Sequence, residues 1–208
     1  MKTRLARDLG KDCAVDVYRA MLEILFKTLS AFPKNQVVLS LAGGDLDLVL
    51  PLPWEEQPDG NLGEKMEAFF KAKLKVHSKV ILIGSDSPYS TPLDLKKALE
   101  VLERDSVVIQ PAADGGYTLI GMREFHPQLF SSMPWSTSLL MNSTLKVLNS
   151  SQISFSLLAQ RFDIDTLEDL KIWFHKDGLE LIEGVLPGLK PGVEFQRLIA
   201  QYQLRRES

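Results

Sequence analysis

Short apolar runs alternate with amphipathic helical patterns along most of this chain. Runs rich in Val, Ile and Leu predict buried strands, and apolar residues spaced three and four apart predict helices. The predicted strands are 37–41, 80–83, 107–110, 117–122 and 153–158, and the predicted helices are 12–31, 61–74, 91–103, 136–148 and 166–173. Gly43 and Gly44 are expected to end the first strand, and the proline-rich stretch 46–58 is ambiguous. The expected helix caps are Thr91, Ser136 or Thr137, and Thr166, which is spaced from Asp169 as in a capping box. This alternation favours a three-layer α/β domain with a mostly parallel, Rossmann-like sheet.

Composition limits the classes of protein that this chain can be. With 208 residues, 45% of them hydrophobic and 25% charged, it is long enough for one globular domain with a sizeable core. The net charge of −3 gives no basic field for a phosphate backbone, so we expect no nucleic-acid partner. The single Cys13 forms no internal disulfide, which favours a reducing compartment, and we expect the cytoplasm. No apolar segment approaches the roughly 20 residues that cross a bilayer.

A carboxylate follows the run 80–84 directly. Asp86 lies in a Ser-Asp-Ser-Pro string after that run. In open α/β sheets, ligands bind outside the carboxyl ends of the strands. Because hard cations take one or two carboxylates from the protein and further oxygens from phosphates and water, Asp86 is a candidate ligand for Mg²⁺ or Mn²⁺. The alternative is a turn aspartate before a proline.

A second carboxylate, Asp114, stands between two predicted strands with Gly115, Gly116 and Tyr117 after it. Paired glycines let a backbone approach a ligand closely and leave N–H groups free to meet an anion. Asp114 can accept a hydrogen bond from a sugar hydroxyl or orient a metal-bound water. The alternative is a glycine turn that joins two strands.

Two further segments combine polar groups with a predicted helix start. Asp163 and Asp165 lie two residues apart at such a start and can reach one metal ion, although the helix dipole alone also rewards carboxylates there. Trp135, Ser136 and Thr137 offer an aromatic wall beside two hydroxyls, as in many sugar sites; a core tryptophan before a helix start is the alternative.

The amino terminus and the loop at 60–63 supply the remaining candidates. Lys2 and Arg4 can clamp phosphates, or they can be solvated charges near a free amino group. Gly60 and Gly63 can belong to a loop that contacts a base or sugar, or simply lead into a helix. A doubly wound domain usually opens with a strand that feeds a phosphate-binding turn, and this chain instead goes almost directly into a helix.

Several of these segments together resemble a known family. They are Lys2–Ala6, Gly60–Met66, Gly84–Pro88, Pro111–Tyr117, Pro134–Thr137 and Asp163–Thr166. In this order they resemble the bacterial glycosyltransferase A-like family of selenodomain-associated or arsenosugar-biosynthesis transferases. The resemblance covers residues 1 to about 173.

The resemblance implies a nucleotide-diphospho-sugar transferase (GT-A) fold for residues 1–173, with 174–208 as a helical C-terminal extension. It implies that Asp86 is a metal ligand, and Asp163 or Asp165 is expected to assist it. In that family the segment matching Lys2–Arg4 follows a first strand and a glycine turn, which the present sequence lacks. Truncation at the start, or a member of the family with weakened nucleotide binding, would account for this difference.

The expected function is a metal-dependent transferase that uses a nucleotide diphosphate sugar and a small-molecule acceptor, with glycosyl transfer as the leading reaction. The alternatives are nucleotidyl transfer from an NTP and a non-catalytic binding or scaffold protein; a homodimer is left open. Asp86 and Asp114 are the expected catalytic residues. Lys2, Thr3, Arg4, Gly60 and Gly63 are assigned to the nucleotide and its phosphates, and Gly115, Gly116, Tyr117, Trp135, Ser136 and Thr137 to the sugar or acceptor.

Overall fold

The structure is a computed structural model that describes residues 3–42 and 51–206. Contacts divide the chain into two compact units. The helical unit comprises Met1–Thr28, Ser85–Tyr89 and Phe162–Ser208, and the sheet unit comprises Leu29–Gly84 and Ser90–Arg161. Each unit is therefore built from segments that are distant in sequence.

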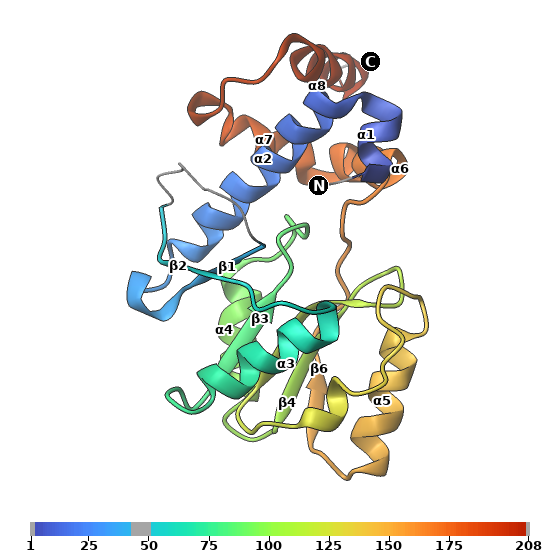
Figure 1. Cartoon of the computed structure of the whole chain (residues 1–208). Coiled ribbons are helices and arrows are strands. Elements are labelled where there is room, and N and C mark those ends of the chain that lie inside the picture. Colours follow the sequence, from blue (N-terminus) through green and yellow to red (C-terminus); the bar gives the residue numbers. More distant parts are fainter. Residues whose placement is uncertain (1–2, 43–50, 207–208) are drawn as a thin grey trace. The chain divides into compact units, whose positions relative to one another are not determined.

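The sheet unit holds the strands (Figure 1). They are β1 (Leu39–Leu41), β2 (Trp54–Glu56), β3 (Val80–Ile83), β4 (Val107–Pro111), β5 (Tyr117–Met122) and β6 (Phe155–Leu157). The first two form a parallel pair, and the others form a four-stranded sheet in the order β3-β5-β4-β6. Only β5 runs antiparallel to its neighbours, so β3, β4 and β6 point the same way. The predicted mostly parallel sheet is confirmed.

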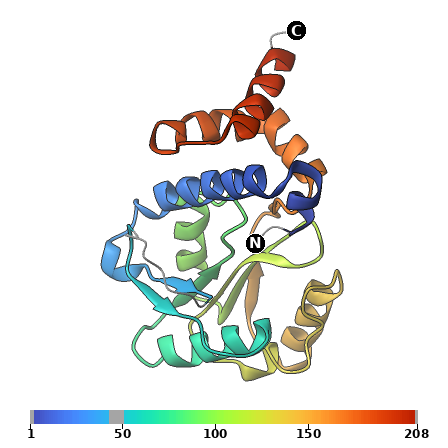
Figure 2. The same cartoon turned by 45° about the horizontal axis from the view of Figure 1, so that its top comes forward.

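Helices cover both faces of the four-stranded sheet (Figure 2). The helices and 3-10 turns that lie within the sheet unit are η1 (Lys34–Gln36), α3 (Leu62–Lys73), α4 (Pro92–Val101), η2 (Pro127–Leu129) and α5 (Leu140–Ser150). On one face, Phe70 of α3 and Leu148 of α5 share a buried core with Ile109 and Ile120. On the other face, Val108 approaches Gly121 closely, as does the buried Leu102 at the end of α4. The expected three-layer α/β arrangement is thus present in this unit.

The helical unit joins both ends of the sequence in one core. Its elements are α1 (Thr3–Leu9), α2 (Lys11–Leu29, whose last residue falls in the sheet unit), α6 (Leu167–Trp173), the π-helical turn η3 (Phe174–Gly178), α7 (Leu179–Glu183), η4 (Leu186–Gly188) and α8 (Val193–Arg206). Leu5, Met21, Trp173 and Phe195 are fully buried together. The division of the chain at residue 173 stays a prediction.

Local signals placed most helix starts correctly. Thr91 caps α4 and accepts from the backbone of Asp94, whose carboxylate accepts from the Thr91 backbone in return. The same reciprocal capping box begins α6 at Thr166. Side-chain oxygens at these positions satisfy N–H groups that the first turn leaves without helical partners. These starts could therefore be predicted from residue type and spacing.

The predicted cap of α5 is wrong. This helix begins at Leu140 without a side-chain cap, rather than at Ser136 or Thr137. The Thr137 hydroxyl donates to the Pro134 carbonyl at 2.8 Å and accepts from the Leu139 amide at 3.3 Å, so it closes a turn before the helix. Ser136 has a positive φ of 60°, which is incompatible with a helix start.

Two other expectations have different outcomes. β2 falls in the proline-rich stretch 46–58, which was ambiguous from the sequence. The glycines expected to end the first strand, at 43 and 44, lie outside the described residues.

Among helices of the described residues, none is long and apolar enough to cross a membrane.

Candidate functional site

Two acidic segments of the helical unit lie side by side. We call residues 85–89 the first acidic segment and residues 162–165 the second. The Ile164 amide donates to the Asp86 carbonyl at 3.1 Å, and the Ser87 hydroxyl donates to the Phe162 carbonyl at 3.3 Å. These bonds join segments that are distant in sequence. They bring Asp86 next to the pair of carboxylates that the sequence singled out.

The two carboxylates of the second acidic segment stand on either side of a core residue. Ile164 has no exposed surface and belongs to the core of the helical unit, whereas Asp163 and Asp165 are only partly buried. Anchoring Ile164 in the core therefore fixes the backbone that carries both carboxylates. The apolar residue between the two aspartates is the local reason that they stay near the surface.

Arg4 donates from Nη1 to Oδ2 of Asp165 at 3.0 Å. The two side chains are 69% and 37% exposed, so this ion pair contributes little to stability. Arg4 and Thr3 both lie in α1, with Thr3 as its first residue, and Lys2 lies outside the described residues. Of the two cations expected to clamp phosphates, the structure describes Arg4, and this arginine is paired with Asp165 of the second acidic segment.

The oxygen atoms of the acidic segments suit Mg²⁺ or Mn²⁺ better than a softer metal. In the described part of the chain, no group of three or more His, Cys, Asp or Glu side chains is placed to hold a metal ion by itself. Mg²⁺ commonly takes one or two carboxylates and completes its shell with phosphate oxygens and water. With fewer than three such side chains gathered in any one place among the described residues, this donor chemistry suits an ion that shares its shell with phosphate oxygens better than a closed structural metal site.

The turn between β4 and β5 belongs to the sheet unit and is closed by its own side chain. The Gly116 amide donates to Oδ1 of Asp114 at 2.8 Å and the Ala112 amide donates to the Gly116 carbonyl at 3.0 Å. Gly115 has a φ of 91°, which glycine adopts at little cost. The geometry is that of a glycine turn between two strands, with the exposed Asp114 carboxylate folded back on the backbone.

Gly115 also contacts the segment before α5. A Cβ added at this glycine would lie 2.3 Å from the Ser138 carbonyl oxygen, and the Met141 amide donates to the Gly115 carbonyl at 2.8 Å. Backbone meets backbone here, so close packing accounts for this glycine without a ligand. Ser136 and Thr137 are exposed in the same segment.

The Trp135 side chain packs against Gly63, in the first turn of α3. A Cβ added at Gly63 would lie 2.2 Å from Nε1 of Trp135, so only glycine fits there. Trp135 stacks on Phe130 at 6.5 Å between ring centroids and meets Tyr117 edge-on at 6.4 Å. Burial raises the pKa of Tyr117 well above its ordinary value. These contacts agree with the alternative that Trp135 is a core tryptophan.

Gly60 precedes the cap of α3 in a conformation that favours glycine. Its φ is 118°, and a Cβ at this position would lie 2.5 Å from Oε2 of Glu64. Glu64 closes the α3 capping box by accepting from the Asn61 amide at 2.7 Å. Gly60 and Gly63 thus both have roles in building the helix start, and their assignment to a nucleotide stays a prediction.

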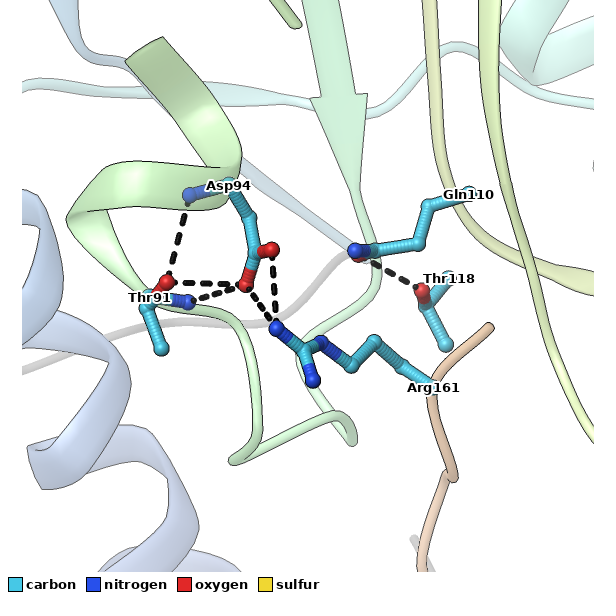
Figure 3. A network of polar contacts seen from close by, with 5 residues as sticks. All are labelled: Thr91, Asp94, Gln110, Thr118 and Arg161. Atoms are coloured by element: carbon cyan, nitrogen blue, oxygen red, sulfur yellow. Dashed lines mark hydrogen bonds and ion pairs between the residues drawn. The ribbon is translucent and has the colours of Figure 1, made fainter. Parts of the chain in front are cut away.

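A polar network lies at the carboxyl end of the sheet (Figure 3). Arg161 donates from Nη2 to both carboxylate oxygens of Asp94, at 2.8 and 2.9 Å. Thr91 donates to Asp94 through both its hydroxyl and its amide. Burial alone would raise the pKa of Asp94, but these hydrogen bonds and the positive charge of Arg161 hold it below its ordinary value. Asp94 is therefore a carboxylate fixed in its charged form.

The second part of the network depends on a β-bulge. The β4–β5 register passes from Gln110↔Leu119 to Pro111↔Tyr117, which leaves Thr118 as an extra residue in β5. A bulge redirects side chains locally, and the Thr118 hydroxyl donates to Oε1 of the fully buried Gln110 at 3.2 Å. Sequence reasoning missed Gln110 and Arg161. The Thr91–Asp94 spacing was visible, but nothing in the sequence marked Arg161 as its partner.

The predicted site residues are thus divided between the two units. Those in the helical unit are Thr3, Arg4, Asp86, Asp163 and Asp165, and those in the sheet unit are Gly60, Gly63, Asp114, Gly115, Gly116, Tyr117, Trp135, Ser136 and Thr137. Within the helical unit the structure brings Asp86 to the second acidic segment and Arg4 to Asp165. Within the sheet unit it brings Gly63, Trp135 and Tyr117 together.

Comparison with solved structures shows a close similarity over almost the whole chain. A crystal structure described as a "putative nucleotide-diphospho-sugar transferase" from Desulfovibrio desulfuricans G20 is 26% identical, with a TM-score of 0.81, over 97% of this chain and 91% of that chain. A Mycobacterium tuberculosis rv0371c homolog from Mycobacterium sp. strain JC1 is 14% identical, with a TM-score of 0.51, over 81% of this chain and 84% of that chain. The second similarity concerns the fold alone.

Comparison of the sequence with curated proteins gives no match. Residues 22–137 match the family described as "Uncharacterized protein conserved in bacteria (DUF2064)". This match includes Gly60, Gly63, Asp86 and the turn at Asp114, and it spans more than half of the chain. The chain therefore belongs to the DUF2064 family of bacterial proteins.

Proposed function

We propose that this chain is a metal-dependent transferase that acts on a nucleotide diphosphate sugar, with glycosyl transfer to a small-molecule acceptor as its reaction. The similarity in fold and sequence to the Desulfovibrio protein described as a "putative nucleotide-diphospho-sugar transferase" supports the substrate class. The observation that carries the proposal is the Ile164–Asp86 hydrogen bond, because it joins two acidic segments that come from distant parts of the sequence.

The residues of the helical unit are assigned to the metal and the phosphates. Asp86, with Asp163 or Asp165, would hold Mg²⁺ or Mn²⁺. The bound ion would supply neutralisation of the charge that develops on the diphosphate leaving group. Lys2, Thr3 and Arg4 are assigned to the phosphates. Arg4 would then exchange its bond to Asp165 for one to a phosphate, which is inexpensive because the pair is exposed.

The residues of the sheet unit are assigned to the remaining parts of the substrates. Asp114, through its exposed carboxylate, would accept from a hydroxyl of the sugar or acceptor. The other assignments are Gly115, Gly116, Tyr117, Trp135, Ser136 and Thr137 to the sugar or acceptor, and Gly60 and Gly63 to the nucleotide. We further propose a transferase domain over residues 1–173, a helical extension over 174–208 and a cytoplasmic location.

A thermal-shift panel tests the substrate class. UDP-, GDP-, CDP- and dTDP-sugars and the NTPs are added with and without Mn²⁺. A ligand present at 100 times its dissociation constant adds about 2.7 kcal/mol to stability, so a true ligand gives a clear shift. We expect one nucleotide sugar to give a shift that depends on Mn²⁺. A shift with NTPs alone would indicate nucleotidyl transfer, and no shift with any compound would refute the proposal in favour of a non-catalytic protein.

Asp86→Asn tests the metal ligand, and Glu23→Gln is its matched control. Both substitutions remove one carboxylate from the helical unit, and Glu23 is exposed on α2. We expect Asp86→Asn to abolish the Mn²⁺-dependent part of the shift and to leave the melting temperature without ligand nearly unchanged. Glu23→Gln should behave as the wild type. If Asp86→Asn lowers the melting temperature without ligand strongly, Asp86 has a structural role instead.

A further inference from the structure

Arg161 is the last residue of the sheet unit before the second acidic segment begins. Its backbone is fixed to the sheet, because its amide donates to the Pro111 carbonyl at 2.9 Å and it forms a parallel bridge with Ala112. The neighbouring Gln160 donates from Nε2 to the Ala112 carbonyl at 3.2 Å. The second acidic segment therefore starts from a backbone position that is well defined within the sheet unit.

Asp94 lies in the sheet unit shortly after the first acidic segment ends. That segment ends at Tyr89, and the chain then enters the sheet unit through Ser90 and the α4 cap Thr91. Asp94 lies in the first turn of α4 and is bonded to Thr91. Both acidic segments are thus attached to the sheet unit near one member of the Asp94–Arg161 pair. Figure 3 shows this pair.

The Asp94–Arg161 ion pair has the geometry of a rigid link. One guanidinium nitrogen lies within 2.9 Å of both carboxylate oxygens, and the two side chains are only 12% and 32% exposed. Hydrogen bonds to charged groups contribute more than neutral ones, and partial burial reduces screening by solvent and salt. The helix cap does not need Arg161, because Thr91 and Asp94 already complete the capping box by themselves. The arginine thus adds a connection that the helix start does not require.

We propose that the Asp94–Arg161 ion pair is a positioning element that sets the spacing of the two acidic segments, and thereby holds Asp86 beside Asp163 and Asp165. The pair acts within the sheet unit, on the chain that follows the first acidic segment and on the residue that precedes the second. The Ile164–Asp86 hydrogen bond joins the two segments themselves in the helical unit. The inference rests on the proposed function only where it concerns a metal ion. Its structural content concerns the backbone of the acidic segments.

Amide hydrogen exchange of Ile164 tests this inference directly, since that amide is the donor to Asp86. We expect Arg161→Gln to speed exchange at Ile164 roughly tenfold, as befits the loss of a charged hydrogen bond. Exchange at Ile120, in the central strand β5, serves as the internal reference for global stability. Arg161→Lys keeps the charge on a more flexible side chain with a different reach, and should give an intermediate rate at Ile164.

Lys79→Gln is the matched control. It also removes a cation and an ion pair from the sheet unit, that of Lys79 with Glu103. Lys79 precedes β3, at the opposite end of that strand from the first acidic segment. We expect wild-type exchange at Ile164 in this variant. If Arg161→Gln changes Ile164, relative to Ile120, no more than Lys79→Gln does, the positioning role is overturned.

Titration with Mn²⁺ alone provides the second measurement. We expect Arg161→Gln to weaken Mn²⁺ binding measurably, because carboxylates that are held at a changed spacing coordinate the ion less well, and we expect Lys79→Gln to bind as the wild type does. Unchanged Mn²⁺ affinity in Arg161→Gln would overturn the link between the pair and the carboxylates. If the wild type itself binds no Mn²⁺, the metal assignment in the proposed function fails, and the exchange rates alone decide the role of Arg161.

Discussion

Substitution of Gly115 by alanine tests why a glycine stands at this position in the turn between β4 and β5. Either the Ser138 backbone packs too closely for a side chain, or a ligand has to approach the turn. The added Cβ would lie 2.3 Å from the Ser138 carbonyl oxygen and 2.8 Å from its Cα. These are backbone atoms, which do not move away as the end of a flexible side chain does. The φ of 91° adds strain that is independent of this contact.

The expected cost can be built from separate contributions. A non-glycine residue in the left-handed region costs about 1–2 kcal/mol. Moving the Ser138 backbone away would also weaken the hydrogen bond from Met141 to the Gly115 carbonyl, which contributes about 1 kcal/mol. The sum is a loss of about 2–3 kcal/mol, or a melting temperature lower by roughly 4–12 °C for a protein of this size.

Gly10→Ala and Gly116→Ala are the matched controls for Gly115→Ala. Gly10 has a φ of 81° with nothing within 4 Å of an added Cβ, so it measures the strain alone. Gly116 has no positive φ, and the nearest atom to its added Cβ is Oδ1 of Asp114 at 3.1 Å. Urea unfolding, followed by signals from each unit, gives the three free energies. A loss at Gly115 no larger than at Gly10 would refute the packing explanation and favour a turn that is free to meet a ligand.

Two further predictions concern titratable groups. Because the pKa of Asp94 is lower in the folded chain, its stabilising effect is present above the ordinary carboxyl pKa and is lost as the pH falls below it. Asp94→Asn should therefore lower the free energy of unfolding in urea at about pH 7, and the difference from the wild type should shrink towards about pH 3; an equal difference at both values would contradict the ion pair. Burial, with the negative charges of Asp16 and Glu194, raises the pKa of Cys13 to about 11, so labelling with a disulfide reagent at about pH 8 should be slow until urea unfolds the helical unit. Rapid labelling of the folded protein would show that Cys13 is accessible.

Elements with local signals were predictable from the sequence. The run 80–83 became β3 with the same bounds, and Thr91 and Thr166 became the caps that their spacing indicated. A β-branched apolar run and a capping box are stabilised mainly by neighbouring residues, so their outcome depends little on the rest of the fold. The predicted cap of α5 was wrong for a local reason too, because the Thr137 hydroxyl donates to the Pro134 carbonyl and closes a turn instead of capping the helix.

Candidate residues were predictable by type but not by contact. The sequence marked Asp86, Asp163 and Asp165 as carboxylates near element ends, and the structure joined their segments through Ile164. Such a bond depends on how distant parts of the chain pack. Sequence spacing carries no information on that packing.

The sequence by itself determined the α/β alternation, the mostly parallel sheet and the helix starts, since these follow from hydrophobic period and from side chains that bond within one turn. Only the tertiary structure decided that β5 is antiparallel, that Thr118 is bulged towards Gln110 and that Arg161 pairs with Asp94. It also decided that Gly63 and Gly115 face an indole and a backbone carbonyl. Each of these features joins residues of different segments or of paired strands, eight residues apart for Thr118 and Gln110 and 67 for Arg161 and Asp94, and such pairs form only when the core has brought them together.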